Sequence, residues 1–379
     1  MDNLYWNGFE WVEVIPTSFE QWQPPAYVPP AVLPAQPPGY MPSAPPPVQP
    51  ACPQGTGALT GIAKAKEQHE KSQAQPGCGA NLPGISSPLA DPRFVYPRAP
   101  FAAQDQPWPG LNSKMIPIPD CGESTYKGCC QLTGRKALVT GGDSGIGRAA
   151  AIALAREGAD VAISYLPAEE SDAREVKALI EAAGRKAILL PGDIRSEKWC
   201  RALVEKAYAQ LGGLDIVVSN AAYQVSQKSI LDISDEQFDQ TMKTNIYGTF
   251  RILRAAIPKL PPGAAIIITS SVQGLDPSPN LTDYAMTKSA LWNLTQSLSR
   301  QLMEKGIRVN AVAPAPVWTP LQTSGGQPTA SYMEYGKTAP MGRPAQPAEL
   351  ASVYVFLASN AASNVTGQLY GVTSGFRLV

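Results

Sequence analysis

The sequence contains a single histidine, His69, among its 379 residues. Histidine is the usual proton carrier of enzymes near neutral pH and a frequent ligand of zinc. A reaction that moves a proton in this chain must therefore use other side chains, and a histidine-based zinc site is excluded. The six cysteines are also few and irregularly spaced, unlike a disulfide framework or a zinc motif. We expect reduced thiols, no bound metal and a cytoplasmic location.

The chain lacks net charge, with 31 basic and 31 acidic residues. Nucleic acid or an acidic membrane would have no electrostatic attraction to such a chain. No run approaches the roughly 18 apolar residues that span a bilayer. The first basic residue is Lys64, which opposes a secretory or transit peptide. We therefore expect a small-molecule substrate and neither a nucleic-acid nor a membrane partner.

Regular apolar periodicity is absent from the first third of the chain, where residues 1–120 hold 24 of the 38 prolines. Proline favours extended polyproline II and cannot build a core, so we expect a disordered arm over 1–103. Within it, "PPAY" (24–27) and "PPGY" (37–40) match the PPxY pattern bound by WW domains, although a simple tether with recurring tyrosines is an alternative. The alternation in residues 4–14 favours a strand or a small docking element.

After residue 134 the pattern becomes regular, following a segment at 104–134 that we expect to pack on a domain over 135–379. Apolar runs rich in β-branched residues alternate with segments of helical length, which is typical of a parallel sheet covered by helices on both faces. The sequence predicts a single α/β domain with a doubly wound parallel sheet, the Rossmann fold. The expected strands are 136–140, 160–164, 186–190, 214–219, 264–270, 307–312 and 368–372, and the expected helices are 146–157, 169–183, 196–211, 234–257, 283–304 and 347–358.

A glycine-rich turn, "TGGDSGIGR" (140–148), follows the first of these strands and precedes the first helix. Gly141, Gly145 and Gly147 allow a tight turn and a close approach of the backbone to a pyrophosphate, which the helix N-terminus would bind. A glycine turn alone is a weak signal, but strand, turn and helix occur here in order. We predict a dinucleotide site that includes the loop residues Asp143, Ser144 and Ile146.

The end of the second strand indicates which dinucleotide binds. An NAD enzyme would present a carboxylate there to the ribose 2′-hydroxyl, whereas this chain has Ser164, Tyr165 and Leu166 before Glu169. Hydroxyl groups tolerate a 2′-phosphate, and Arg148 is a candidate for further support. NADP is therefore favoured over NAD.

Asp193, in "PGDI" after the third strand, suits the amino group of adenine, with Ile194 beside it. Asp193 could equally be the N-cap of the following helix, and the two roles are compatible.

Tyr284 and Lys288 in "DYAMTKSA" lie four residues apart and share one face of a helix. A nearby ammonium group stabilises a phenolate and lowers the pKa of tyrosine, so this pair can replace histidine. Ser271 ends the strand "AAIIITSS" at the same edge of the sheet. We expect Ser271 to hold a carbonyl oxygen, Tyr284 to donate the proton, and Lys288 to lower the Tyr284 pKa and bind the nicotinamide ribose.

Several motifs in order resemble the short-chain dehydrogenase/reductase family. They are "TGGDSGIGR", "SNAA" (219–222), "KTNIYGTF", "SSVQG", "YAMTK" and "APAPVWT" (313–319). More narrowly, "KMIPIPDCGESTYKG" and "RKAILLPGDI" are similar to the bacterial NADP-dependent aldehyde reductases, relatives of the general stress oxidoreductases. The resemblance covers about 104–379.

The resemblance implies a catalytic tetrad of Asn245, Ser271, Tyr284 and Lys288, with Asn245 supporting a water relay to Lys288. By itself Asn245 would be interpreted as a helix-bending or capping residue. The resemblance also implies a homotetramer built partly on the helices 234–257 and 283–304. It adds cofactor contacts at Asn220, Ala221, Val317 and Thr319.

Three positions depart from the family pattern, because Ala222, Ala315 and Ser374 replace glycine. An added Cβ could press on the nicotinamide or demand a different backbone angle. Either effect would reduce the affinity for the cofactor or the turnover.

Residues 320–346 are rich in glycine and proline and suggest a flexible lid over the substrate, with an ordinary surface connection as the alternative. The pocket candidates Val272, Gln273, Trp318 and Leu321 are mostly apolar, and no basic residue is obviously placed to hold an acid.

The leading hypothesis is thus an NADPH-dependent reductase of small uncharged aldehydes or ketones. The alternatives are an NAD-dependent alcohol or sugar dehydrogenase and a non-catalytic protein that acts through its PPxY motifs.

Overall fold

The computed structural model describes residues 4–6, 11–13 and 89–378. Near the N-terminus, β1 (Leu4–Trp6) pairs with β2 (Trp11–Glu13) as an antiparallel hairpin, in agreement with the strand expected within 4–14. The two PPxY matches and His69 lie outside the described residues.

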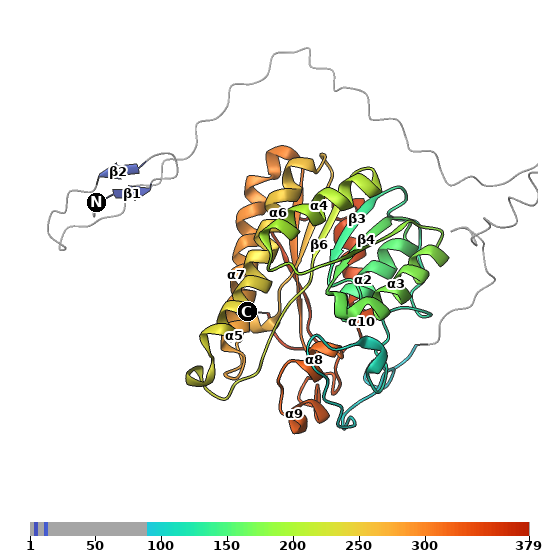
Figure 1. Ribbon diagram of the computed structural model, residues 1–379, viewed down its shortest axis with the longest axis vertical. Coiled ribbons are helices and arrows are strands. Elements are labelled where there is room, and N and C mark those ends of the chain that lie inside the picture. The colour runs from blue at the N-terminus through green and yellow to red at the C-terminus, as the bar shows by residue number, and fades with distance from the viewer. Residues whose placement is uncertain (1–3, 7–10, 14–88, 379) are drawn as a thin grey trace, which may run out of the picture. The chain divides into compact units, whose positions relative to one another are not determined.

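The domain is built on a seven-stranded parallel sheet in the order β5-β4-β3-β6-β7-β8-β9. This confirms the predicted doubly wound α/β fold (Figure 1). The chain moves outward from β3 to β5 and then returns to place β6 beside β3, so a topological switch point lies between β3 and β6. Ligands of such sheets bind beyond the carboxyl ends of the strands at this point. The strands are β3 (Lys136–Thr140), β4 (Asp160–Tyr165), β5 (Ala187–Pro191), β6 (Ile216–Ser219), β7 (Ala265–Thr269), β8 (Arg308–Pro314) and β9 (Leu369–Val372).

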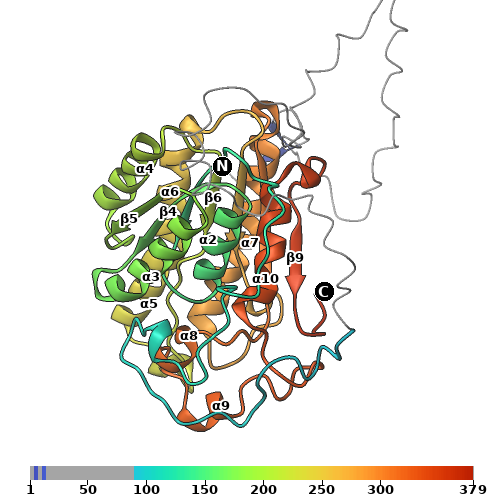
Figure 2. The ribbon, with the colours of Figure 1, turned by 90° about the vertical axis from the view of Figure 1, so that its right-hand side faces the viewer.

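Helices cover both faces of the sheet (Figure 2). One face packs against α2 (Gly145–Arg156), α3 (Glu170–Ala182) and α10 (Pro347–Ala358). The other packs against α4 (Glu197–Leu211), α6 (Thr249–Ala256) and α7 (Thr282–Gln301). The predicted helix 234–257 is divided into α5 (Asp235–Met242), a π-helix (Lys243–Gly248) and α6.

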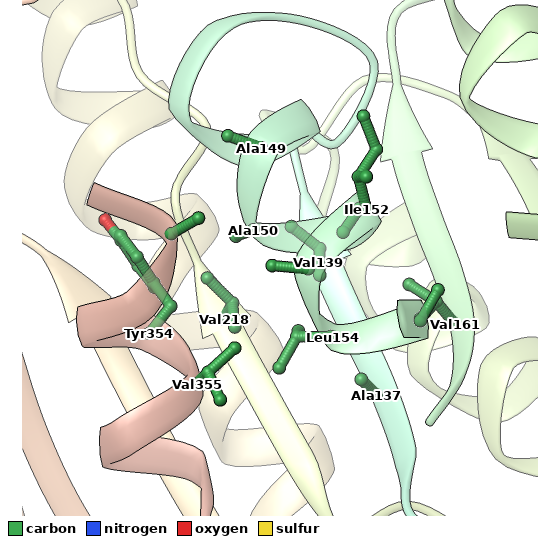
Figure 3. Packing of buried hydrophobic residues seen from close by; sticks show 14 of the residues in the cluster. Ala137, Val139, Ala149, Ala150, Ile152, Leu154, Val161, Val218, Tyr354 and Val355 are labelled. Carbon is green, nitrogen blue, oxygen red and sulfur yellow. The ribbon is translucent and has the colours of Figure 1, made fainter. Parts of the chain in front are cut away.

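Small side chains on α2 bring this helix close to the sheet and to α10. Ala149, Ala150 and Leu154 of α2 are fully buried in the cluster that contains Val139 of β3 and Tyr354 of α10 (Figure 3). Alanine keeps high helix propensity while allowing two backbones to approach. This packing fixes the start of α2, and with it the glycine-rich turn, against the end of β3.

The first part of the extension 89–134 lies along the carboxyl edge of the domain beside the segment 315–346, as both ribbon views show for the teal chain next to α8 (Pro320–Ser324) and α9 (Thr329–Met333) (Figures 1 and 2). Its last part passes the C-terminal end of α2, where the N–H of Leu132 donates to the Glu157 carbonyl oxygen. Phe101 stacks on Trp318 with ring centres 4.1 Å apart. Contacts of this extension with the domain begin at Pro92, whose carbonyl oxygen accepts a hydrogen bond from Arg343. Packing therefore begins before residue 104.

Candidate functional site

A cavity of about 930 Å³ opens at the carboxyl ends of the strands, from the glycine-rich turn to α7. Its position at the switch point matches the place where the sequence analysis expects the dinucleotide. Of the expected cofactor contacts, all but Gly147 line it, namely Gly141, Asp143, Ser144, Gly145, Ile146, Ser164, Tyr165, Asp193, Ile194, Asn220, Ala221, Tyr284, Lys288, Val317 and Thr319.

The glycines of the turn are required by contacts within the domain. A Cβ on Gly147 would lie 1.9 Å from the carbonyl oxygen of Gly141, and one on Gly145 would lie 2.9 Å from Thr319. Gly141 and Gly145 also have φ angles of +61° and +50°, which glycine adopts without cost. The turn is thus a backbone cradle at the N-terminus of α2, and it fits the pyrophosphate of a dinucleotide.

Asn220 holds the loop after β6 against this turn. Its side-chain amide donates to the carbonyl oxygens of Thr140 and Gly141, both at 3.3 Å. The hydroxyl of Thr140 accepts hydrogen bonds from the backbone N–H groups of Asn220 and Ala221. These bonds fix the two sides of the switch point relative to each other.

Arg148 does not reach the cavity. Its guanidinium is buried in ion pairs with Glu123 at 2.8 Å and Glu175 at 3.1 Å. The expectation that Arg148 assists a 2′-phosphate is therefore wrong, because two carboxylates from neighbouring segments hold its guanidinium outside the cavity lining.

Asp193 lines the cavity but does not cap α4. Its carboxylate pairs with Arg195 at 2.7 Å, while Ser196 is the N-cap and accepts a hydrogen bond from the N–H of Trp199. The capping role suggested for Asp193 is thus wrong, since the N-cap lies three residues later at Ser196.

Tyr284 and Lys288 lie in the first turns of α7 and line the cavity together. The Lys288 ammonium nitrogen is 5.3 Å from the centre of the Tyr284 ring and donates to the carbonyl oxygen of Thr269 at 2.8 Å. Burial lowers the pKa of Lys288 to about 7. Burial also raises the pKa of Tyr284 to about 12, against a smaller lowering by a hydrogen bond with Ser271.

The protein alone therefore does not give Tyr284 the lowered pKa that the sequence analysis expects. The reason is that desolvation penalises both charged forms, so neither the ammonium nor the phenolate is strongly favoured. A phenolate here would form most easily while Lys288 carries its proton.

Ser271 follows β7 and lines the cavity beside Tyr284. Its hydroxyl oxygen accepts a hydrogen bond from the N–H of Gln273 at 3.1 Å. Ser271 is therefore oriented by the 3-10 turn Val272–Gly274 that it caps.

Asn245 lies in the π-helix and does not line the cavity. Its side chain bonds both the N–H and the carbonyl oxygen of Tyr223, at 2.7 and 2.9 Å, and donates to the Thr287 hydroxyl at 3.0 Å. Thr287 is adjacent to Lys288. Asn245 thus ties the loop after β6 to the helix that carries Lys288.

Two features of the cavity differ from the sequence-based expectation. Trp318 does not line it, because the ring is fully buried against Phe101 and donates its N–H to Pro117. Trp108 of the extension does line it and packs edge-on against Tyr223. No local motif marks Trp108, since its position depends on how residues 89–134 cross the domain.

The substrate side is more polar than expected. Val272, Gln273 and Leu321 line it as predicted. Several polar residues that the sequence pattern does not predict also line it, and one of them is basic. They are Gln224, Asn280, Gln322, Gln327 and Arg377.

The three residues that replace glycine have different consequences. Ala222 and Ala315 line the cavity as expected. Only Ser374 has a left-handed backbone, with φ of +51°, which strains a residue that carries a Cβ.

Among the described residues, no group of histidine, cysteine and acidic side chains is arranged to bind a metal ion. The same part of the chain has no helix long and apolar enough to cross a membrane.

Comparisons with known proteins agree with this architecture. A family model described as Enoyl-(Acyl carrier protein) reductase matches residues 141–377. The chain is 56% identical over 292 residues to the uncharacterized oxidoreductase YghA of Escherichia coli (strain K12), covering 77% of this chain and 99% of that protein. It is 45% identical over 280 residues to general stress protein 39 of Bacillus subtilis (strain 168), covering 74% and 97%.

A solved structure is similar to the domain. The short chain dehydrogenase of Burkholderia cenocepacia J2315, in complex with NADP, is similar with a TM-score of 0.59 and 32% identity, covering 65% of this chain and 98% of that one. With the glycine cradle, the switch-point cavity and the relatives in agreement, this chain belongs to the short-chain dehydrogenase/reductase family of NAD(P)-dependent oxidoreductases.

Proposed function

We propose that this protein uses NADPH to reduce small uncharged aldehydes or ketones to alcohols. The observation that carries the proposal is the meeting of Ser271, Tyr284 and Lys288 in one cavity with the glycine-rich turn. Bound NADPH would supply a hydride to the carbonyl carbon. The side chains of the protein must then hold the carbonyl oxygen and provide its proton.

Ser271 and Tyr284 suit these two tasks. The Ser271 hydroxyl is fixed beside Tyr284 and can donate to the carbonyl oxygen. Tyr284, whose raised pKa keeps it protonated at neutral pH, can act as the general acid. The phenolate left behind is stabilised by the Lys288 ammonium. The attraction between the two opposite charges offsets part of the free-energy cost of burying them.

Lys288 has donors left for a second role. An ammonium group has three N–H donors, and one of them binds the Thr269 carbonyl oxygen. We propose that another binds the nicotinamide ribose. Asn245 acts as a positioning residue for Lys288 through Thr287, and a water relay from it is part of the same proposal.

NADP is supported by Ser164 and Tyr165 at the end of β4, which offer no carboxylate within the strand, and by the relative that binds NADP. A homotetramer that uses α5, α6 and α7 and a cytoplasmic location belong to the proposal as well.

An NAD-dependent alcohol or sugar dehydrogenase is the second candidate. It is favoured by the carboxyl groups of Asp143 and Glu169 at the adenosine side of the cavity, and by the polar residues on the substrate side, among them Gln224 and Asn280.

The test is the rate of NADPH oxidation by the purified full chain with a panel of small aldehydes and ketones, beside NADH and beside polyols with NAD. Turnover with NADPH and a neutral carbonyl compound is expected. Oxidation of polyols by NAD without any NADPH-dependent reduction would replace the first proposal by the second.

A further inference from the structure

A short loop of the N-terminal extension forms part of the cavity wall. Residues 106–113, here called the bridge loop, precede β3, the first strand of the sheet. Two of them, Trp108 and Pro109, line the cavity, and both are half-buried. A doubly wound sheet and its helices form a dinucleotide site without any such segment. The bridge loop is therefore an addition to the site, and its contacts indicate what it does there.

The bridge loop is held in one conformation by the side chain of Gln106. The Oε1 atom of Gln106 accepts a hydrogen bond from the N–H of Leu111 at 2.8 Å, and the Nε2 atom donates to the Leu111 carbonyl oxygen at 3.1 Å. Between these two residues, a hydrogen bond closes a turn over 107–110, with Trp108 and Pro109 at its centre. The turn presents these two residues to the cavity.

The bridge loop is fastened to α8 on one side. The N–H of Gln106 donates to the Thr323 carbonyl oxygen at 3.0 Å. The Ser324 hydroxyl donates to the Pro109 carbonyl oxygen at 3.1 Å. Gly110 lies so close to α8 that a Cβ on it would be 3.0 Å from the Ser324 hydroxyl oxygen, and its φ is +77°. Glycine is thus required at this position by both space and backbone angle.

The other end of the bridge loop contacts the glycine-rich turn and α3. Asn112 is 1% exposed, and its side-chain oxygen accepts a hydrogen bond from the N–H of Gly145 at 3.3 Å. The Asn112 N–H and the Ser113 hydroxyl both donate to the carboxylate of Asp172 on α3, at 2.5 and 2.7 Å. The bridge loop is therefore also fastened beside the turn that would bind a pyrophosphate.

Trp108 reaches a third part of the site, the loop after β6. Its ring packs edge-on against Tyr223, with ring centres 5.2 Å apart and planes at 78°. The backbone of Tyr223 is held by Asn245, and the neighbouring residues Ala222 and Gln224 line the cavity. Trp108 thus connects the α8 side of the cavity wall with the loop after β6.

We propose that the bridge loop encloses the middle of a bound nicotinamide dinucleotide, with Trp108 as the side chain that contacts it. The inference rests on the proposed use of this cofactor and deepens it. A dinucleotide that reaches from the glycine-rich turn to Tyr284 passes beneath a segment that is fastened at both ends. An enclosed ligand exchanges slowly in both directions, because the enclosing segment must move before the ligand enters or leaves.

The experiment is a stopped-flow measurement of NADPH and NADH binding and release by the full chain and by Trp108→Ala, followed by nucleotide fluorescence. We expect the release rate of the preferred nucleotide to rise about tenfold in Trp108→Ala, the equivalent of about 1.4 kcal/mol. The association rate should also rise, on the order of threefold, because binding that waits for a conformational change is slowed. Loss of a simple contact would change mainly the release rate.

A second variant displaces the bridge loop without removing the indole ring. Gly110→Ala places a Cβ against Ser324 in a left-handed backbone, and it should raise both rates in the same way. Phe94→Ala is the matched control, since Phe94 is an aromatic residue of the same extension but is 62% exposed and does not line the cavity. Both of its rates should remain those of the unmodified protein.

Unchanged release from Trp108→Ala and Gly110→Ala, faster release without faster association, or an equal effect of Phe94→Ala would overturn the inference and leave the reductase proposal intact. Binding of neither nucleotide to the unmodified protein would overturn both. Faster exchange in the two variants of a protein that reduces no carbonyl compound would support the bridge loop and contradict only the reductase proposal, because the measurement requires no reaction.

Discussion

Lys288 and Tyr284 are buried groups whose proposed work requires them to carry charge. Burial favours the neutral form of each, with the Lys288 pKa near 7 and the Tyr284 pKa near 12. Each unit of such a shift corresponds to about 1.4 kcal/mol between the two protonation states. Opposite charges that arise together stabilise each other, so the pair is best suited to forming a phenolate beside an ammonium group.

Ser374 occupies a left-handed backbone conformation, which affects the free energy of unfolding. A non-glycine residue in this conformation destabilises the folded state by about 1–2 kcal/mol. Glycine avoids this strain, but its greater freedom in the unfolded chain lowers the free energy of unfolding by about 0.5–1 kcal/mol. Ser374→Gly should therefore raise the free energy of unfolding by about 0.5–1 kcal/mol, as measured by denaturant titration.

Ser374→Ala is the control, since it removes the hydroxyl but keeps the Cβ and the strain. If the alanine variant gained as much stability as the glycine variant, backbone strain would not be the cause.

Sequence patterns at the residue scale identified Ser271, Tyr284 and Lys288 because each follows a strand or begins a helix at a known edge of the sheet. Such local patterns do not predict the ion pairs of Arg148 with Glu123 and Glu175, because these partners lie in other segments of the sequence.

The extension 89–134 is hydrogen-bonded to the segment 320–346 beside the cavity. The sequence suggested a flexible lid over 320–346, but this segment carries α8 and α9 and is bonded to the extension. The N–H of Gln106 donates to the Thr323 carbonyl oxygen at 3.0 Å, and the Tyr332 hydroxyl donates to Asp105 at 3.0 Å. The segment 320–346 is therefore bonded to residues more than 200 positions earlier in the sequence.

Phe101→Ala should loosen this fastening. Phe101 is 4% exposed and stacks on Trp318, and removing a buried phenyl ring costs about 3–5 kcal/mol. We expect a lower free energy of unfolding together with faster limited proteolysis within 89–134.

Phe94→Ala is the matched control, because Phe94 belongs to the same extension but is 62% exposed. If Phe101→Ala were no more sensitive to protease than Phe94→Ala, the stacking contact would not hold the extension in place.

The π-helix at Lys243–Gly248 is a further element that sequence periodicity could not show. The π-helix follows α5 and precedes α6 without a break, so the sequence pattern predicts one continuous helix over 234–257. The turn places the Asn245 amide against Tyr223 and Thr287.

At the scale of the whole molecule, alternating apolar strands and helices determined the fold class, and the observed strands agree with the expected ones to within two residues at each end. This success follows from the burial of β3 and β7 on both faces, which demands continuous apolar runs. The course of the extension was not predictable because proline-rich segments have no such periodicity.

The proposed oligomer also belongs to this scale. Large apolar side chains are exposed on the helices that would form its interfaces, including Phe238, Tyr247, Phe250 and Met286 at 40–51%. Phe250→Glu should reduce the mass of the assembly in sedimentation analysis, because an unpaired carboxylate in an apolar interface is costly.

Leu231→Glu is the control, since Leu231 is 91% exposed on the 3-10 turn Ile230–Asp232, outside these helices. An unmodified protein that sediments as a monomer, or a Phe250→Glu variant of unchanged mass, would contradict the proposed assembly.

The role of Tyr284 as general acid is tested by the turnover of Tyr284→Phe with NADPH and an aldehyde that the unmodified protein reduces, measured together with the Kd for NADPH. We predict a loss of about 10²–10⁴-fold in turnover, the usual contribution of a general acid, with the Kd unchanged within about twofold because only the hydroxyl is removed. Turnover close to that of the unmodified protein would show that another group supplies the proton.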